Sequence, residues 1–262
     1  MALIVLASAS GSPGVSTTAL GLTLNWHRPV LLVDADPTGS SSVFAGYFHG
    51  TQQPTGGLIN LALSLREGTL ADALPRETLL LDPEAPAERS AWFLPGIRAH
   101  EQAPSLLPLW DPLTEQLRAL ERNGQDVIVD AGRLGLVGSP TPLLDAADAA
   151  LLVTRATLPT ISAARSWAET VRQPATGWRH PCLLLIAEGQ PYRATEVSKV
   201  LGMPVVADLP DDPAAAAVYH RGAAPPKHFE TGPYIRALQA TVQSVQAHIA
   251  RGRFALVEEA RP

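Results

Sequence analysis

The sequence predicts an α/β fold in which helices cover both faces of a mostly parallel β-sheet. Short apolar runs alternate with stretches of helical periodicity along nearly the whole chain, as βαβ units require. A glycine-rich turn follows the first apolar run, and aspartates follow two of the later ones. The length of 262 residues and a hydrophobic content of 46% suit a single domain over 1–262 with a large buried core.

Six apolar runs have the length and composition of strands that are buried on both faces. They are Leu3–Leu6, Val30–Val33, Val127–Val129, Ala150–Val153, Leu183–Ile186 and Val205–Ala207. Helices are expected between these runs, near 17–26, 58–66, 112–122, 160–172, 193–201 and 212–221.

Two later segments complete the expected outline of the chain. Residues 82–110 contain five prolines and are expected to form a long irregular excursion over the surface, with a short strand at Ala91–Leu94. A last helix is expected at about 233–250, where apolar residues recur every three or four positions. That spacing predicts a helix that packs on the domain.

Residues 10–19, SGSPGVSTTA, have the frame of a phosphate-binding loop between a strand and a helix. Compared with G-x-x-x-x-G-K-[ST], Gly11 matches the first glycine and Thr18 the hydroxyl that binds Mg²⁺, whereas Ser16 replaces the second glycine and Thr17 the lysine. Backbone N–H groups at such a helix start cradle phosphates. The residues expected to contact phosphate are Gly11, Ser12, Pro13, Gly14, Val15, Ser16, Thr17 and Thr18.

A second motif, residues 30–39 (VLLVDADPTG), places Asp34 and Asp36 directly after a buried run. Open α/β sheets bind ligands at the carboxyl ends of their strands, so both are candidate catalytic residues. Successive strand side chains point to opposite faces, which predicts different roles: Asp36 orients an attacking water, and Asp34 lies near a metal ion. The alternative interpretation is an Asx turn at the end of the strand, before the proline and glycine.

A third motif, residues 126–132 (DVIVDAG), is an apolar run that ends in Asp130. This is the form of a Walker B strand, whose aspartate holds Mg²⁺ directly or through water. Thr18 and Asp130 are therefore the candidate metal ligands, and ATP or ADP with Mg²⁺ is the expected cofactor.

In this order, the three motifs resemble the deviant Walker A ATPases of the ParA/MinD family, which belong to the SIMIBI class of P-loop proteins. Further similar segments cover nearly the whole chain: 68–74 (GTLADAL), 94–96 (LPG), 147–154 (ADAALLVT), 201–204 (LGMP) and 209–213 (LPDDP). The resemblance implies a parallel-sheet P-loop fold, ATP-dependent homodimerisation, and the positioning of chromosomes, plasmids, division sites or pili. It also adds Pro210 to the nucleotide-binding residues.

The sequence departs from the family at its two lysines and in the continuation of the Walker B strand, where Ala131 and Gly132 replace the family's usual proline-containing run. Members carry K-G-G-x-G-K-[ST]-[ST], with one lysine that reaches across the dimer and one on the β- and γ-phosphates. Aligned through Gly14 and Thr18, these positions hold Ser12 and Thr17 here. Removal of one preorganised donor typically slows such chemistry by ~10²–10³, so ATP hydrolysis is expected to be weak, partner-dependent or absent. Backbone N–H groups, Thr18 and Mg²⁺ can still hold phosphates.

Two basic residues are candidates to replace the missing lysines. Arg133 follows the Walker B strand closely and is a candidate nucleotide-binding residue, and Lys227 lies in a loop expected over 222–233. Each has a plain alternative interpretation as an exposed loop side chain.

The expected function is a ParA/MinD-like nucleotide switch for positioning or partitioning. The alternative is a non-hydrolysing pseudo-ATPase that keeps the fold as an adaptor or scaffold, and a third possibility is a metabolic P-loop enzyme such as a dethiobiotin-synthetase-like ligase.

The expected partners are a second copy of the chain and an unidentified protein. A net charge of −5 does not favour contact with DNA or anionic membranes, although Arg251 and Arg253 could touch phosphates. A cytoplasmic location is expected, because the chain has no leader-like start and no apolar run of about 20 residues.

Overall fold

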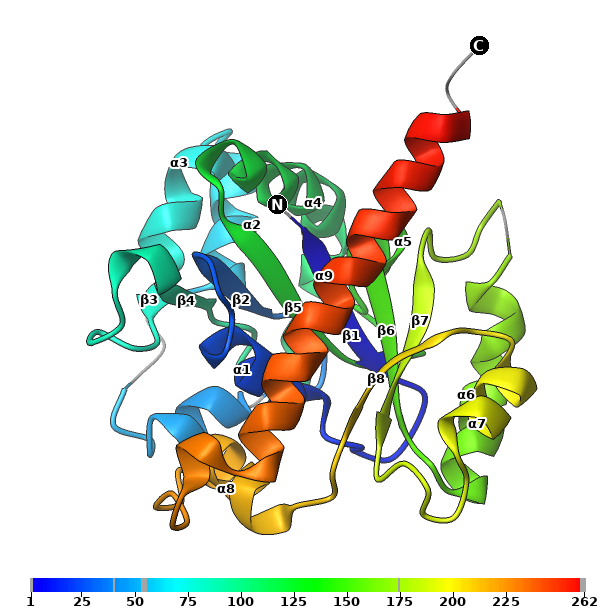
Figure 1. The fold of residues 1–262 in the computed structure, drawn as a ribbon. Helices are drawn as coiled ribbons and strands as arrows, with labels where there is room; N and C mark the ends of the chain where they lie inside the picture. The colour runs from blue at the N-terminus through cyan, green and yellow to red at the C-terminus, as the bar shows by residue number, and fades with distance from the viewer. Residues whose placement is uncertain (1, 40, 53–55, 174, 260–262) are drawn as a thin grey trace.

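The structure, a computed structural model, describes residues 2–39, 41–52, 56–173 and 175–259 (Figure 1). Its strands form one sheet in the order β3-β4-β2-β5-β1-β6-β7-β8. Every neighbouring pair is parallel except β3 and β4, which are antiparallel. The predicted fold class, a mostly parallel sheet between helices, is therefore confirmed.

All six predicted strands are present, and so is the short strand within the irregular segment. Their bounds are β1 (Leu3–Ser8), β2 (Val30–Asp34), β4 (Ala91–Leu94), β5 (Asp126–Arg133), β6 (Ala149–Arg155), β7 (Pro181–Ile186) and β8 (Val205–Leu209). The two-residue edge strand β3 (Leu79–Leu80) was not predicted, because two residues are too few to show a period.

The predicted helices are present, with ends that differ by a few residues. The α-helices are α1 (Val15–Leu24), α2 (Leu58–Arg66), α3 (Leu70–Ala73), α4 (Trp110–Ala119), α5 (Thr141–Ala146), α6 (Leu158–Val171), α7 (Ala194–Leu201), α8 (Pro213–Arg221) and α9 (Pro233–Glu259). The short helical turns are η1 (Val43–Tyr47, a π-turn) and the 3₁₀ turns η2 (Leu74–Glu77), η3 (Ala87–Arg89), η4 (His100–Leu109), η5 (Leu120–Asn123) and η6 (Phe229–Thr231). The last helix continues beyond its expected end near residue 250. Within the described residues, no helix is both long and apolar enough to cross a bilayer.

The segment 82–110 differs from the expected surface excursion at its carboxyl-terminal end. Residues 100–109 form η4, whose Ala103, Leu106 and Leu109 are buried. A 3₁₀-helix has three residues per turn, so these three side chains share one face and reach the core. The prolines in this segment, and the lack of a 3.6-residue period, make the helix hard to recognise from the sequence.

The core lies on both faces of the sheet, as the alternation along β1 shows. Leu3, Val5 and Ala7 belong to one apolar cluster, and Ile4 and Leu6 belong to the other. The first cluster includes side chains of α2, α4, α5, α6 and α7, whereas the second includes those of α1, α8 and α9. The central strands are therefore covered on both faces, and their carboxyl ends are where polar residues gather.

Helix α9 is the long red helix that crosses one face of the molecule in Figure 1. Its predicted apolar stripe is buried, namely Ile235, Leu238, Val242, Val245 and Ile249. Leu238 packs so closely on α1 that a Cβ atom at Gly21 would lie 3.1 Å from its Cδ1. The expectation that this helix packs on the domain is confirmed.

Candidate functional site

The loop between β1 and α1 lies at the carboxyl edge of the sheet, between the two strands that flank β1. Gly14 has a φ of 105° and Ser12 a φ of 42°, so the chain turns through left-handed conformations before the helix begins. The first helical hydrogen bond is donated by the Thr18 N–H to the Gly14 carbonyl, at 2.8 Å. The free N–H groups of the first helical turn and the helix dipole favour an anion at this end of α1.

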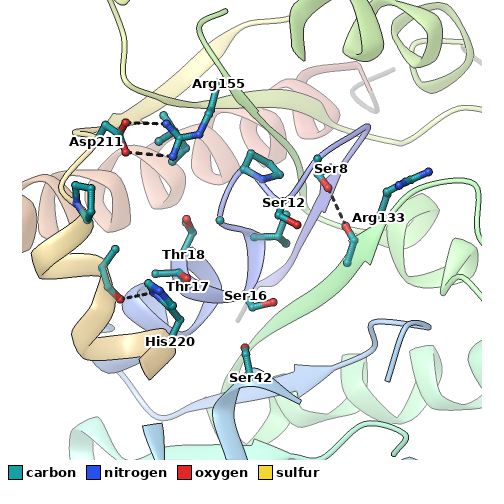
Figure 2. Close-up of a pocket in the computed structure, with 18 of the residues that line it drawn as sticks. Ser8, Ser12, Ser16, Thr17, Thr18, Ser42, Arg133, Arg155, Asp211 and His220 are labelled. Atoms are coloured by element: carbon teal, nitrogen blue, oxygen red, sulfur yellow. Dashed lines mark hydrogen bonds and ion pairs between the residues drawn. The ribbon is translucent and has the colours of Figure 1, made fainter. Parts of the chain in front are cut away.

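A cavity of about 600 Å³ opens beside this loop (Figure 2). Every predicted nucleotide-binding residue lines it: Gly11, Ser12, Pro13, Gly14, Val15, Ser16, Thr17, Thr18, Arg133 and Pro210. Asp36 lines it as well. Residues from three widely separated parts of the chain thus meet at one place, as the parallel topology requires.

A second cavity, of about 140 Å³, adjoins the first and contains the other two predicted carboxylates. Asp34 and Asp130 line it, together with Asp36 and Ser16. Asp34 and Asp130 are register partners on β2 and β5, and they are only 8% and 5% exposed. Burial raises the pKa of Asp34 to about 6 and the pKa of Asp130 to about 7. The charge of Asp36 also raises both pKa values, and the charge of Asp34 further raises that of Asp130.

Hydrogen bonds of the Asx-turn type do form at the end of β2. The Asp36 N–H lies 3.4 Å from an Asp34 carboxylate oxygen, and the Thr38 N–H donates to Asp36 at 2.9 Å. The strand ends at Asp34, so Asp36 no longer follows the strict alternation of strand side chains, and both aspartates reach the smaller cavity. Asp34 and Asp36 therefore form the turn and also line the cavity, so the two interpretations do not exclude each other.

Asp36 is also held closely against the Walker B segment. A Cβ atom at Gly132 would lie 2.3 Å from the Asp36 carboxyl carbon, so this contact is possible only with glycine at residue 132. Gly132 has a φ of 62°, and its N–H donates to Asp130 at 2.9 Å. Because residue 132 is glycine, the Asp36 carboxyl group can lie against the backbone whose N–H group binds Asp130.

The donor set fits a hard divalent cation such as Mg²⁺. The Ser41 hydroxyl lines the smaller cavity together with Asp34 and Asp130. Carboxylate and hydroxyl oxygens are ligands that Mg²⁺ accepts, and two crowded carboxyl groups would each gain from a cation. Within the described residues, no group of three or more His, Cys, Asp or Glu side chains could hold a metal ion. A Mg²⁺ ion here would therefore need phosphate or water oxygens to complete its shell.

The two candidate replacements for the lysines occupy different places. The exposed Arg133 lines the larger cavity, but its guanidinium extends away from the loop (Figure 2). Lys227 is exposed and is not among the residues that line this cavity. Arg253, considered above for contact with phosphates, lies 3.5 Å from Asp148 and 3.8 Å from Glu121.

Arg155, Asp211 and His220 are among the residues that line the larger cavity and that sequence reasoning did not assign to the site. Arg155 ends β6 and pairs through both terminal nitrogens with Asp211, in the segment after β8. The Nδ1 atom of His220 on α8 lies 2.8 Å from the Ala216 carbonyl oxygen. The position of Arg155 at a strand end was the one signal that could have identified it.

No protein-family model matches the chain, and no curated protein matches it by sequence. Solved structures do match over nearly its whole length. One is the cell division ATPase MinD of Pyrococcus furiosus, with 19% identity and a TM-score of 0.70, covering 94% of this chain and 99% of that one. Another is a ParA family ATPase of Chlorobium tepidum, with 16% identity and a TM-score of 0.68, covering 92% of this chain and 98% of that one. A third is the septum site-determining protein MinD of Pyrococcus horikoshii, complexed with Mg-ADP, with 16% identity and a TM-score of 0.64, covering 95% of this chain and 97% of that one.

The protein therefore has the fold of the P-loop NTPases. Within that class, its sheet and helices are of the MinD/ParA type.

Proposed function

We propose that this protein binds ATP or ADP with Mg²⁺ in the larger cavity and acts as a ParA/MinD-like positioning or partitioning protein. The observation that carries the proposal is the meeting of the loop at residues 11–18 with the buried carboxyl pair Asp34 and Asp130. The structure of the MinD protein from Pyrococcus horikoshii, which has the same fold, contains Mg-ADP, and this supports the choice of ligand.

Each residue of the site would have its own role in binding or hydrolysis. The loop would hold the phosphates through the start of α1, with Pro210 and Arg133 lining the same cavity. Thr18 and Asp130 would hold Mg²⁺, which neutralises phosphate charge when it is bound. Asp34 would lie beside the metal, and Asp36 would orient an attacking water.

We expect hydrolysis to be weak, dependent on a partner, or absent. Ser12 and Thr17 occupy the positions of the family's two lysines, and neither can carry a positive charge. Each missing cation in a charged transition state costs ~10²–10³ in rate, whereas binding depends largely on backbone groups and the metal.

The alternative is a pseudo-ATPase that keeps the fold as an adaptor or scaffold. The same two substitutions favour it, since they remove the cations on which turnover depends. In both versions the proposed partners are a second copy of the chain and another protein. The net charge of −5 favours neither DNA nor an anionic membrane as the main partner.

The test is a thermal-shift titration with ATP and ADP, with and without Mg²⁺, on the wild type and on Thr18→Ala. Ligand at 100 times its Kd should stabilise the protein by about 2.7 kcal/mol, and the Thr18→Ala variant should lose the Mg²⁺-dependent part. Thr23→Ala is the matched control: Thr23 lies on the same helix, is equally buried, and does not line the cavity.

The outcomes separate the two versions. A Mg²⁺-dependent shift in the wild type and in Thr23→Ala supports nucleotide binding, and light scattering then shows whether ATP produces a dimer. No shift at millimolar nucleotide would contradict nucleotide binding by the isolated chain and leave the scaffold as the better account.

A further inference from the structure

An ion pair between Arg155 and Asp211 lies in the lining of the larger cavity (Figure 2). The two terminal nitrogens of Arg155 lie 2.8 and 3.1 Å from the two carboxylate oxygens of Asp211. Arg155 ends β6 and Asp211 follows β8, and both residues line the cavity that the loop also lines. A cationic group therefore lies at the nucleotide site although the loop has none.

The pair contributes little to holding the fold together. Both side chains remain more than a third exposed, at 37% for Arg155 and 36% for Asp211. Ion pairs with such access to water contribute little to stability, because solvent screens the two charges. The guanidinium can therefore exchange its carboxylate for another oxyanion at low cost.

Arg155 has the right place and chemistry to bind a phosphate group. Strand β6 pairs with β1 up to Ser8 and Val153 and with β7 up to Ile186 and Arg155, so Arg155 ends its strand at the carboxyl edge of the sheet, where it lines the same cavity as the loop. Its planar fork binds a phosphate through two parallel hydrogen bonds, as it now binds the carboxylate. Of the two arginines that line the cavity, Arg133 extends away from the loop (Figure 2).

We propose that Arg155 is the phosphate-binding cation of this cavity, and that Asp211 holds its guanidinium in place until a phosphate of the nucleotide displaces the carboxylate. The proposal rests on the proposed nucleotide binding and specifies a side-chain cation that strengthens binding in place of a loop lysine. Asp211 is then a positioning residue that competes with the ligand. Substitution of Arg155 should therefore weaken binding, whereas substitution of Asp211 should not.

The experiment is a calorimetric titration of ATP, ADP and inorganic tripolyphosphate in the presence of Mg²⁺. A charge-assisted hydrogen bond is worth about 1.5–3 kcal/mol, so Arg155→Ala should weaken ATP binding by roughly 10- to 100-fold and Arg155→Lys by less. Asp211→Asn should leave binding unchanged or tighten it, because the competing charge is gone. Arg165→Ala, at an exposed arginine that does not line the cavity, is the control and should stay within about twofold of the wild type.

Tripolyphosphate distinguishes contact with phosphate from contact with the rest of the nucleotide. Arg155→Ala should weaken tripolyphosphate binding as much as ATP binding. An effect on ATP alone would assign Arg155 to the base or ribose and overturn the proposal.

Two further results would overturn it without affecting the proposed function. One is wild-type binding that Arg155→Ala and Arg155→Lys leave unchanged. The other is equal weakening by Arg155→Ala and Asp211→Asn, since a pair that only holds two loops together would be damaged from either side. Failure of the wild type to bind any probe contradicts the proposed function itself, together with this proposal.

Discussion

Asp34 on β2 and Asp130 on β5 are register partners in adjacent parallel strands, so two buried carboxyl groups share one small cavity. Equivalent positions of parallel neighbours point to the same face of a sheet, which is why the two charges cannot avoid each other. Burial and the charges of the neighbouring aspartates raise the pKa of both groups, so the pair should make the stability of the protein depend on pH.

The first prediction concerns pH. The folded pKa values of about 6 and about 7 lie above the ordinary value of 3.8, so the folded state retains protons that the unfolded chain has released. The free energy of unfolding should therefore fall as pH rises from about 4 to about 7. Asp130→Asn should flatten this part of the profile and stabilise the protein at pH 8 by roughly 1–3 kcal/mol.

Urea denaturation across this pH range measures the effect. Asp72→Asn, at an exposed carboxyl group, is the control and should leave the profile unchanged. Parallel profiles for the wild type and Asp130→Asn would show that the buried pair does not hold protons at neutral pH.

The second prediction concerns the approach of Gly132 to Asp36. In Gly132→Ala, the new Cβ would lie 2.3 Å from the Asp36 carboxyl carbon, so the aspartate must move. We expect a loss of roughly 2–4 kcal/mol, part of it from the left-handed backbone, and weaker nucleotide binding.

Gly124→Ala isolates the backbone part of this loss. Gly124 has a φ of 71°, but no atom lies within 4 Å of the place that an alanine Cβ would take, so only the left-handed cost of about 1–2 kcal/mol applies. Thermal unfolding and nucleotide titration of both variants give the comparison. Equal effects of the two on nucleotide affinity would argue against a role for the Gly132–Asp36 contact.

The third prediction restores one missing cation. Thr17 lines the larger cavity on the first turn of α1, so Thr17→Lys places an ammonium group beside the proposed phosphate site. Binding of ATP should tighten by roughly 10-fold or more, as expected for a charge-assisted hydrogen bond. Calorimetric titration with Thr17→Gln as the neutral control tests this, and equal affinities for the two variants would place the phosphates elsewhere.

The fourth prediction concerns the docking of α9. Leu238 is fully buried and packs against α1 at Gly21, so Leu238→Ala should lower the free energy of unfolding by about 2–5 kcal/mol. Phe254 on the same helix is 74% exposed, and its replacement by alanine should change stability by less than about 0.5 kcal/mol. Similar losses from the two variants in urea denaturation would contradict this account of the helix.

Local pattern was a good guide to the central strands and to the loop. Strands such as β1 and β6 are buried on both faces and therefore appear as continuous apolar runs, which are easy to recognise. The segment η4 was not recognised, because its buried residues follow the three-residue period of a 3₁₀-helix and its prolines suggested a loop. A short edge strand such as β3 has no period at all.

The sequence by itself determined the alternation of strands and helices, the glycine-rich turn, and the aspartates that follow two of the apolar runs, Asp34 at the end of β2 and Asp130 within β5. Each of these is a local property, decided by hydrophobic burial or by backbone freedom within a few residues. Only the tertiary structure decided which polar groups meet. Arg155 and Asp211 lie 56 residues apart and become partners because β6, β7 and β8 are neighbours in the sheet. Strand order depends on the packing of the whole chain, so no local pattern contains it.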